Sequence, residues 1–237
     1  MIGPEFGLLK MKALPSLTKY MERLRSHKRI VPLLRGRVHV LNIFVYLYSF
    51  YKLKGRKLAP EFKYAYAVLF FVSIVGSIII AWYHNNVWDL KQRAFYRRLD
   101  YGFIFLSIVS PWFPVHVYYI KDGFTTAFVL VHWAVATAGT LASLIYDFSL
   151  APKTVRVVLF NICGQFNWHV AYRMYTSGRI LEFYYFFIGT TCYFLSGVVY
   201  AAKYPNPISR IFEHHEVMHL LIVVGNYFAF QTNLAMV

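Results

Sequence analysis

The sequence predicts an all-α integral membrane protein, built as a seven-helix bundle. Hydrophobic residues make up 58% of the 237 residues and charged residues only 15%, whereas soluble domains carry a much larger charged share. Seven apolar stretches are each near the roughly 20 residues that a helix needs to cross a bilayer. We place them at about 34–51, 64–84, 100–119, 124–146, 154–172, 181–201 and 214–235.

The segment before the first predicted span is strongly basic. Residues 1–30 hold seven Lys and Arg residues among scattered apolar side chains. This pattern predicts a cytoplasmic N-terminal arm that contacts anionic lipid headgroups, although a solvated tail fits the same residues. We expect residues 31–237 to form one seven-transmembrane domain, because no linker or change of composition divides them.

Polar side chains interrupt two of the apolar stretches. The first stretch begins with Arg35, Arg37 and His39. The fifth stretch carries several polar side chains, so we expect its helix to face the bundle interior. These side chains are Asn161, Gln165, Asn167 and His169.

The distribution of basic residues predicts how the chain is oriented. If the N-terminus lies inside, 17 of the 25 Lys and Arg residues fall on the inner side and 8 on the outer side. This excess predicts a cytoplasmic N-terminus and a C-terminus on the outer or luminal side. The basic residues lie at the ends of apolar stretches, so we interpret the formal charge of +15 as topology signals and lipid contacts. We expect no nucleic acid partner.

The most informative segment opens the seventh span and runs from Glu213 to His219. His215 and His219 are four residues apart and therefore lie on one face of a helix, about one turn from each other. Ionisable side chains inside a span are costly and usually mark a functional site. We predict that these two imidazoles are ligands of a zinc ion. The alternative is a hydrogen-bonded pair at the mouth of the helix.

The order of the spans brings other side chains to the same depth. His84 ends the second span, Asp100 begins the third and His215 begins the seventh, so all three lie in the inner leaflet. His84 is therefore the predicted third ligand, although it could be an interfacial imidazole instead. Three neutral imidazoles leave a fourth tetrahedral position open, as in catalytic zinc sites. Asp100 could orient or deprotonate a water there, or could pair with Arg97 or Arg98.

The same segment matches the H-E-x-x-H pattern of zinc proteases, in which the glutamate is the general base. Glu216 and His214 are each rotated about 100° from the ligand face, which argues against a general-base or ligand role. No His, Asp, Glu or Cys follows His219, so a third ligand has to come from upstream. Three further histidines are interpreted as core or interfacial residues: His116, His132 and His169.

Several of these segments resemble one known family. Trp82-Tyr83-His84 and Arg98-Leu99-Asp100-Tyr101 look like the second and third spans of the hemolysin III / progestin and adipoQ receptor family. The segments Tyr193–Pro205 and Phe212–Leu220 are similar to its sixth and seventh spans. The resemblance covers roughly residues 35–235.

This resemblance implies a seven-helix fold with a cytoplasmic N-terminus and a zinc ion held by His84, His215 and His219. It also implies that Asp100 holds the zinc-bound water. The family usually has a serine four residues before the histidine of the second span, and Ile80 occupies that position here. The Thr-rich turn usual after the aspartate of the third span is replaced by Ser110-Pro111-Trp112-Phe113-Pro114.

Three functions are compatible with these residues. An open zinc site beside a carboxylate, inside a bundle surrounded by lipid, suggests a zinc-dependent hydrolase whose substrate is a lipid amide such as ceramide. The hemolysin III resemblance also suggests a pore-forming hemolysin or channel with cytolytic activity. The third alternative is a seven-transmembrane receptor in which the zinc ion is structural.

Overall fold

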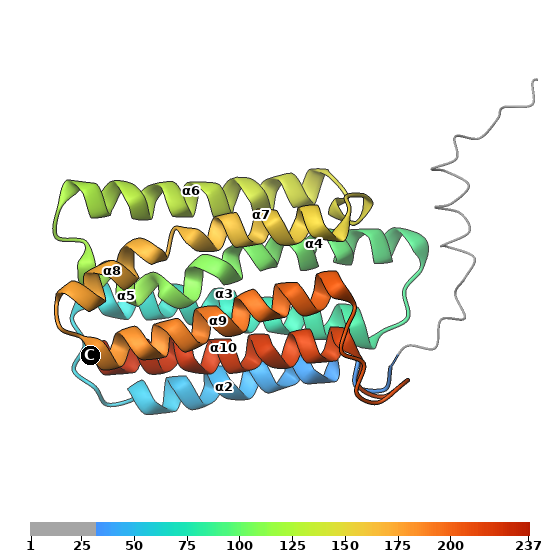
Figure 1. Ribbon diagram of the computed structural model, residues 1–237, viewed down its shortest axis with the longest axis horizontal. Coiled ribbons are helices and arrows are strands. Elements are labelled where there is room, and N and C mark those ends of the chain that lie inside the picture. The colour runs from blue at the N-terminus through green and yellow to red at the C-terminus, as the bar shows by residue number, and fades with distance from the viewer. Residues whose placement is uncertain (1–31) are drawn as a thin grey trace, which may run out of the picture. The chain divides into compact units, whose positions relative to one another are not determined.

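The computed structural model describes residues 32–237, and the predicted basic arm of residues 1–30 lies outside this range. Within the described range every regular element is a helix, and the helices run back and forth along one direction (Figure 1). The elements are α2 (Arg37–Leu53), α3 (Pro60–Asn85), α4 (Leu90–Val109), η1 (Ser110–Trp112), α5 (Phe113–Tyr119), α6 (Gly123–Ile145), η2 (Phe148–Leu150), α7 (Lys153–Gln165), α8 (Trp168–Thr176), α9 (Ile180–Ala202) and α10 (His214–Met236).

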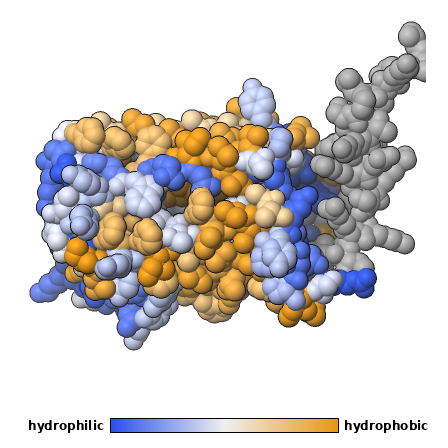
Figure 2. Space-filling view, viewed as in Figure 1, coloured by the Kyte–Doolittle hydropathy of each residue, from blue (hydrophilic) through white to orange (hydrophobic). Residues whose placement is uncertain are grey.

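The seven predicted spans correspond to seven helical columns, so the predicted all-α bundle is confirmed. Five of the columns are long and apolar enough to cross a membrane: α3, α4 continued through α5, α6, α9 and α10. The shorter α2 and the pair α7–α8 complete the bundle. Figure 2 shows hydrophobic residues across the middle of one face and hydrophilic residues towards both ends, as a protein that spans a membrane requires.

The third column is interrupted where proline enters it. Pro111 has no backbone N–H and its ring cannot continue a regular α-helix, so the chain passes through the 3₁₀ turn η1 between α4 and α5. This turn buries Trp112, which is 1% exposed and packs against Phe186 of α9. The segment Ser110–Pro114, which replaces the Thr-rich turn, therefore contributes to the core between the helices.

Helices α9 and α10 approach closely because two glycines face the contact. A Cβ atom on Gly225 would lie 2.5 Å from Cε1 of Tyr193, and one on Gly189 would lie 3.3 Å from the Gly225 carbonyl oxygen. Small residues allow such close packing between helices in a membrane. The Tyr193 hydroxyl donates to Asn226 Oδ1 at 2.7 Å, and Asn226 Nδ2 donates to Asn42 of α2 at 2.8 Å. These contacts fix α10 between α9 and α2.

Candidate metal centre

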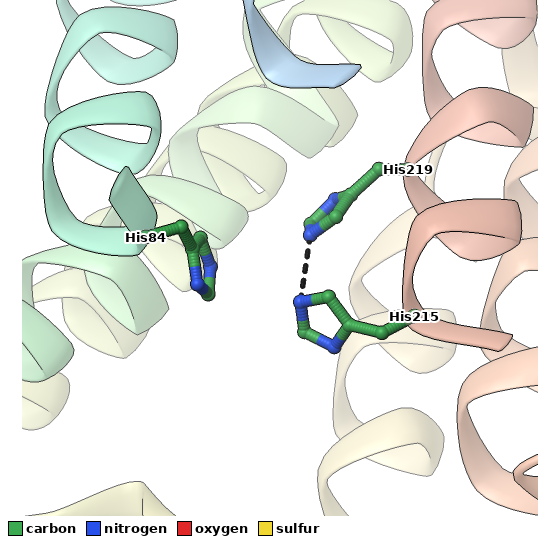
Figure 3. Close-up of side chains that lie close together, drawn as sticks. All are labelled: His84, His215 and His219. Carbon is green, nitrogen blue, oxygen red and sulfur yellow. Dashed lines mark hydrogen bonds between the residues drawn. The ribbon is translucent and has the colours of Figure 1, made fainter. Parts of the chain in front are cut away.

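The first turns of α10 carry two of the predicted ligands. A capping box between Glu213 and Glu216 begins this helix. His215 and His219 follow on one face, and their Nε2 atoms lie 2.9 Å apart. Figure 3 shows both rings directed away from the α10 backbone into the same space.

The third predicted ligand, His84, reaches the same space from the last turn of α3 (Figure 3). Its ring centroid lies 5.2 Å from that of His215 and 5.6 Å from that of His219. One ligand atom from each of the three imidazoles lies within 4.8 Å of the others. The end of one span and the beginning of another therefore converge at one depth, and the three-His cluster (His84, His215 and His219) forms a possible metal site.

A glycine lets α2 begin directly against this cluster. Gly36, the residue before α2, has a φ of 76°, a backbone conformation that residues other than glycine rarely adopt. A Cβ atom at Gly36 would lie only 2.7 Å from Cβ of His84. The start of the first span is thereby held beside the end of the second.

Asp100 lies on α4 and faces the three-His cluster. Its Oδ2 atom is 3.8 Å from Nε2 of His84, which is too long for a direct hydrogen bond. The two neighbouring arginines have partners on the segment that follows α6 and at the end of α6. Arg97 pairs with Asp147, and Nη1 of Arg98 donates to the Leu144 carbonyl at 3.4 Å.

The two α10 residues that were predicted to point away from the ligand face make structural contacts. Glu216 is fully buried, pairs with Arg35 and accepts a hydrogen bond from the backbone N–H of Glu213 at 2.9 Å. Nδ1 of His214 lies 2.8 Å from Asn206 Oδ1. A glutamate occupied in this way is unsuited to act as the general base of a protease.

A cavity of about 670 Å³ extends from the three-His cluster into the bundle. Its end beside the cluster is lined by polar side chains that include Asp100 and Tyr83. On α4 the lining continues from Asp100 to the apolar Ile104 and Ile108, and Phe194 of α9 also lines the cavity. Asn161 and Gln165 of α7 also line it, as expected for a span that faces the interior. Figure 2 shows a hollow on the face that carries α7 and α9.

Two residues of this region were missed from the sequence as parts of the site. His39 and Arg35 both line the cavity, although in the sequence they only interrupt the first apolar stretch. The available signal was topological. The start of the first span lies at the same depth as the end of the second, so polar residues there are candidates for the same site.

The histidines that were interpreted as core residues form a separate group. The ring centroids of His116 and His132 lie 5.6 Å apart, and Nε2 of His116 lies 3.1 Å from Oδ1 of Asn167. Nε2 of His169 lies 3.1 Å from the Thr125 hydroxyl. We call His116, His132 and His169 the second histidine group. Among the described residues, the cavity lining does not include these three histidines.

One comparison with known proteins bears on the whole chain. The sequence model of a family described as haemolysin-III related matches residues 28–230, which is well over half of the sequence. This match and the long apolar helices together identify an integral membrane protein.

Proposed function

The chain belongs to the haemolysin-III related family, and we propose that it is a zinc-dependent hydrolase that cleaves a lipid amide such as ceramide within the membrane. The observation that carries this proposal is the convergence of the three imidazoles beside Asp100 at one end of a large cavity. A hydrolytic metal site needs ligands, a proton acceptor and space for a substrate, and these are adjacent here.

The donor set favours zinc. Imidazole nitrogen is a preferred zinc ligand, whereas magnesium and calcium prefer several oxygen atoms. His84, His215 and His219 would hold the ion and leave one tetrahedral position for a substrate or water. When bound, zinc lowers the pKa of a water to about 7 and polarises a carbonyl group.

Asp100 is the proposed catalytic residue. The carboxylate of Asp100 lies near His84 but does not form a hydrogen bond with it. The carboxylate oxygens are therefore free to accept a proton from a water or substrate group held at the metal centre. The same carboxyl group could then return the proton to the leaving amine. Ile80 occupies the position of the serine in the family pattern and supplies no hydroxyl there. Ser77 also lines the cavity, about two turns from His84 along α3.

The cavity suits an amphipathic substrate. The end beside Asp100 would take the amide and headgroup, and apolar lining residues such as Ile104, Ile108 and Phe194 would contact an acyl chain. Val157 of α7 and Gly197 of α9 line the cavity on the face where Figure 2 shows a hollow, and this is the proposed entry for a lipid from the bilayer. The proposed partners are therefore the lipid bilayer and a lipid substrate, with anionic headgroups at the basic segment 1–30.

We also propose the orientation that the basic residues predict, with a cytoplasmic N-terminus and a C-terminus outside or in a lumen. The metal centre then lies in the inner leaflet, because His84 ends α3 and His215 begins α10. A Val237→Cys variant in sealed vesicles tests this orientation. A membrane-impermeant thiol reagent should label the new cysteine only from the outer or luminal side.

The function itself is tested with purified, zinc-loaded protein in liposomes that contain a fluorescent ceramide. We expect release of the fatty acid, and no release from protein stripped of metal. A His132→Gln variant, which changes a buried imidazole of the second histidine group, should retain activity. Protein that holds stoichiometric zinc and cleaves no ceramide-like lipid would contradict the proposal. Dye leakage from the same liposomes would instead support a pore.

A further inference from the structure

A fourth imidazole reaches the metal centre from a third helix. His39 lies in the first turn of α2 and is 3% exposed. Its Nε2 atom lies 3.1 Å from Nε2 of His219, which itself lies 2.9 Å from Nε2 of His215. The His39 ring is nearly parallel to that of His84, at 5°, with centroids 6.1 Å apart.

Hydrogen bonding alone does not account well for these contacts. A neutral imidazole carries one N–H and one lone pair, so Nε2 of His219 offers either a hydrogen or a lone pair. One hydrogen bond can therefore explain its contact with His39 or with His215, but not both equally. A cation shared by all three nitrogens explains both contacts, because each nitrogen then contributes a lone pair to the same point.

The separations agree with a shared coordination sphere. Two nitrogens bound at about 2.0–2.1 Å to one tetrahedral zinc lie roughly 3.3–3.4 Å apart. The contacts of His219 with His39 and with His215, 3.1 and 2.9 Å, are each within a few tenths of an ångström of that value. The ring of His84 is further away, with one nitrogen within 4.8 Å of the ligand atoms of His215 and His219, so it has to move towards the ion to complete the set.

The local structure holds His39 in this place. Arg35, which lies just before α2, pairs with the buried Glu216, the residue that follows His215 on α10. Gly36 then brings the chain against His84. On the far side of His39, Asn42 accepts the hydrogen bond from Asn226 of α10. The first turns of α2 are thus attached to α3 and α10 both before and after His39.

We propose that His39 is a fourth ligand, so that in the resting protein α2, α3 and α10 together hold the ion through four imidazoles. This inference rests on the proposed function, because it concerns the same ion. It also adds a condition to that function. A catalytic site needs an open position, so the His39 side chain has to leave the ion before a substrate oxygen can approach.

The test is a titration of full-length, metal-stripped protein with Co²⁺, whose visible spectrum reports the ligands and geometry of the site. Replacing His39 with Ala should weaken Co²⁺ binding by at least about 100-fold, the upper end of the loss caused by removing an outer hydrogen-bond partner. The visible bands should also change. The matched control, His132→Ala, removes an imidazole that is equally buried and lies in the second histidine group, and it should change neither.

Each outcome bears on a different claim. If wild-type protein binds Co²⁺ and His39→Ala binds it with the same affinity and spectrum, the fourth-ligand inference is wrong and the proposed function stands. If wild-type protein binds no metal, both fail. X-ray absorption of the zinc-loaded wild type requires no variant, so it decides the matter even if His39→Ala does not fold. Four imidazoles per zinc support the inference, and three overturn it.

Discussion

The two groups of histidines in this bundle differ in geometry more than in surroundings. Both lie between helices, and His116 and His219 are each at most 5% exposed. In the three-His cluster the ring nitrogens point at one another and at the end of a cavity. In the second histidine group, His116 and His169 instead meet side chains of other types, Asn167 and Thr125.

The difference teaches that burial of histidines does not by itself bring their ring nitrogens together at one point. What distinguishes the first group is the spacing of His215 and His219 on one helix face, opposite the end of a neighbouring helix at the same depth. The residues of the second group lie on three different elements, α5, α6 and α8, and one nitrogen each of His116 and His169 contacts an amide or a hydroxyl oxygen. Perturbing each group in turn separates the two roles.

Removing the metal should have the largest effect on the first group. If zinc is present at about 100 times its dissociation constant, it stabilises the folded protein by about 2.7 kcal/mol. For a chain of this size, chelation should therefore lower the melting temperature by roughly 5–10 °C. Differential scanning fluorimetry with and without chelator measures this shift. A His215→Ala variant should lose the shift, whereas a His132→Ala variant should keep it.

Replacing Asp100 with Asn should separate catalysis from metal binding. The amide cannot accept a proton as the carboxylate does, so we expect the turnover of a ceramide-like lipid to fall by about 10²–10⁴-fold. Zinc content should stay at the wild-type level, because Asp100 is not one of the proposed ligands. Full activity in this variant would remove Asp100 from the mechanism. Loss of zinc would instead make it a ligand.

Truncating His116 to Ala should affect only stability. The change removes the partner of the buried Asn167 side chain, and leaving such a group unsatisfied costs about 1–3 kcal/mol. We expect a melting temperature a few degrees lower, measured in the same detergent, with unchanged metal content. A loss of metal in His116→Ala would show that the second histidine group is coupled to the metal centre.

The smallest effect concerns the loop that supports α4 beside Asp100. Burial tends to raise the pKa of the Asp147 carboxyl, but hydrogen bonds from Ser149 and Arg97 outweigh it and hold the pKa below its usual value of 3.8. A lowered pKa in the folded state stabilises the protein above pH 3.8 and loses this effect as the pH falls through the folded value. Asp147→Asn should therefore melt slightly lower than wild type at pH 7, by about 1 kcal/mol or less in free energy. Thermal melts at several pH values should show this difference shrinking below pH 3.8. A difference independent of pH would contradict the assignment.

Much of the fold could be predicted from the sequence because membrane spans are long and apolar. The same order of spans predicted that His84, Asp100 and His215 share a depth, and the structure brings them together. The break at Pro111 also has a signal in the sequence, although the division of the fifth span into α7 and α8 was not expected.

The lateral contacts could not be predicted in the same way. Depth follows from the position of a residue along a span, but its neighbours depend on how each helix is rotated and packed. The pairing of Arg35 with Glu216 and the contact of His39 with His219 join the start of the described chain to α10 near its end. Close packing of this kind depends on glycines such as Gly36, whose role is visible only once the partner is known.

The central claim is that imidazoles from α3 and α10 hold one zinc ion, and metal analysis of purified protein tests it most directly. Wild-type protein and a His215→Ala/His219→Ala double variant would be purified in parallel, and zinc per chain measured for each. We predict about one zinc ion per wild-type chain and none above background in the double variant. Equal zinc in both proteins, or none in wild type supplied with zinc, would contradict the claim.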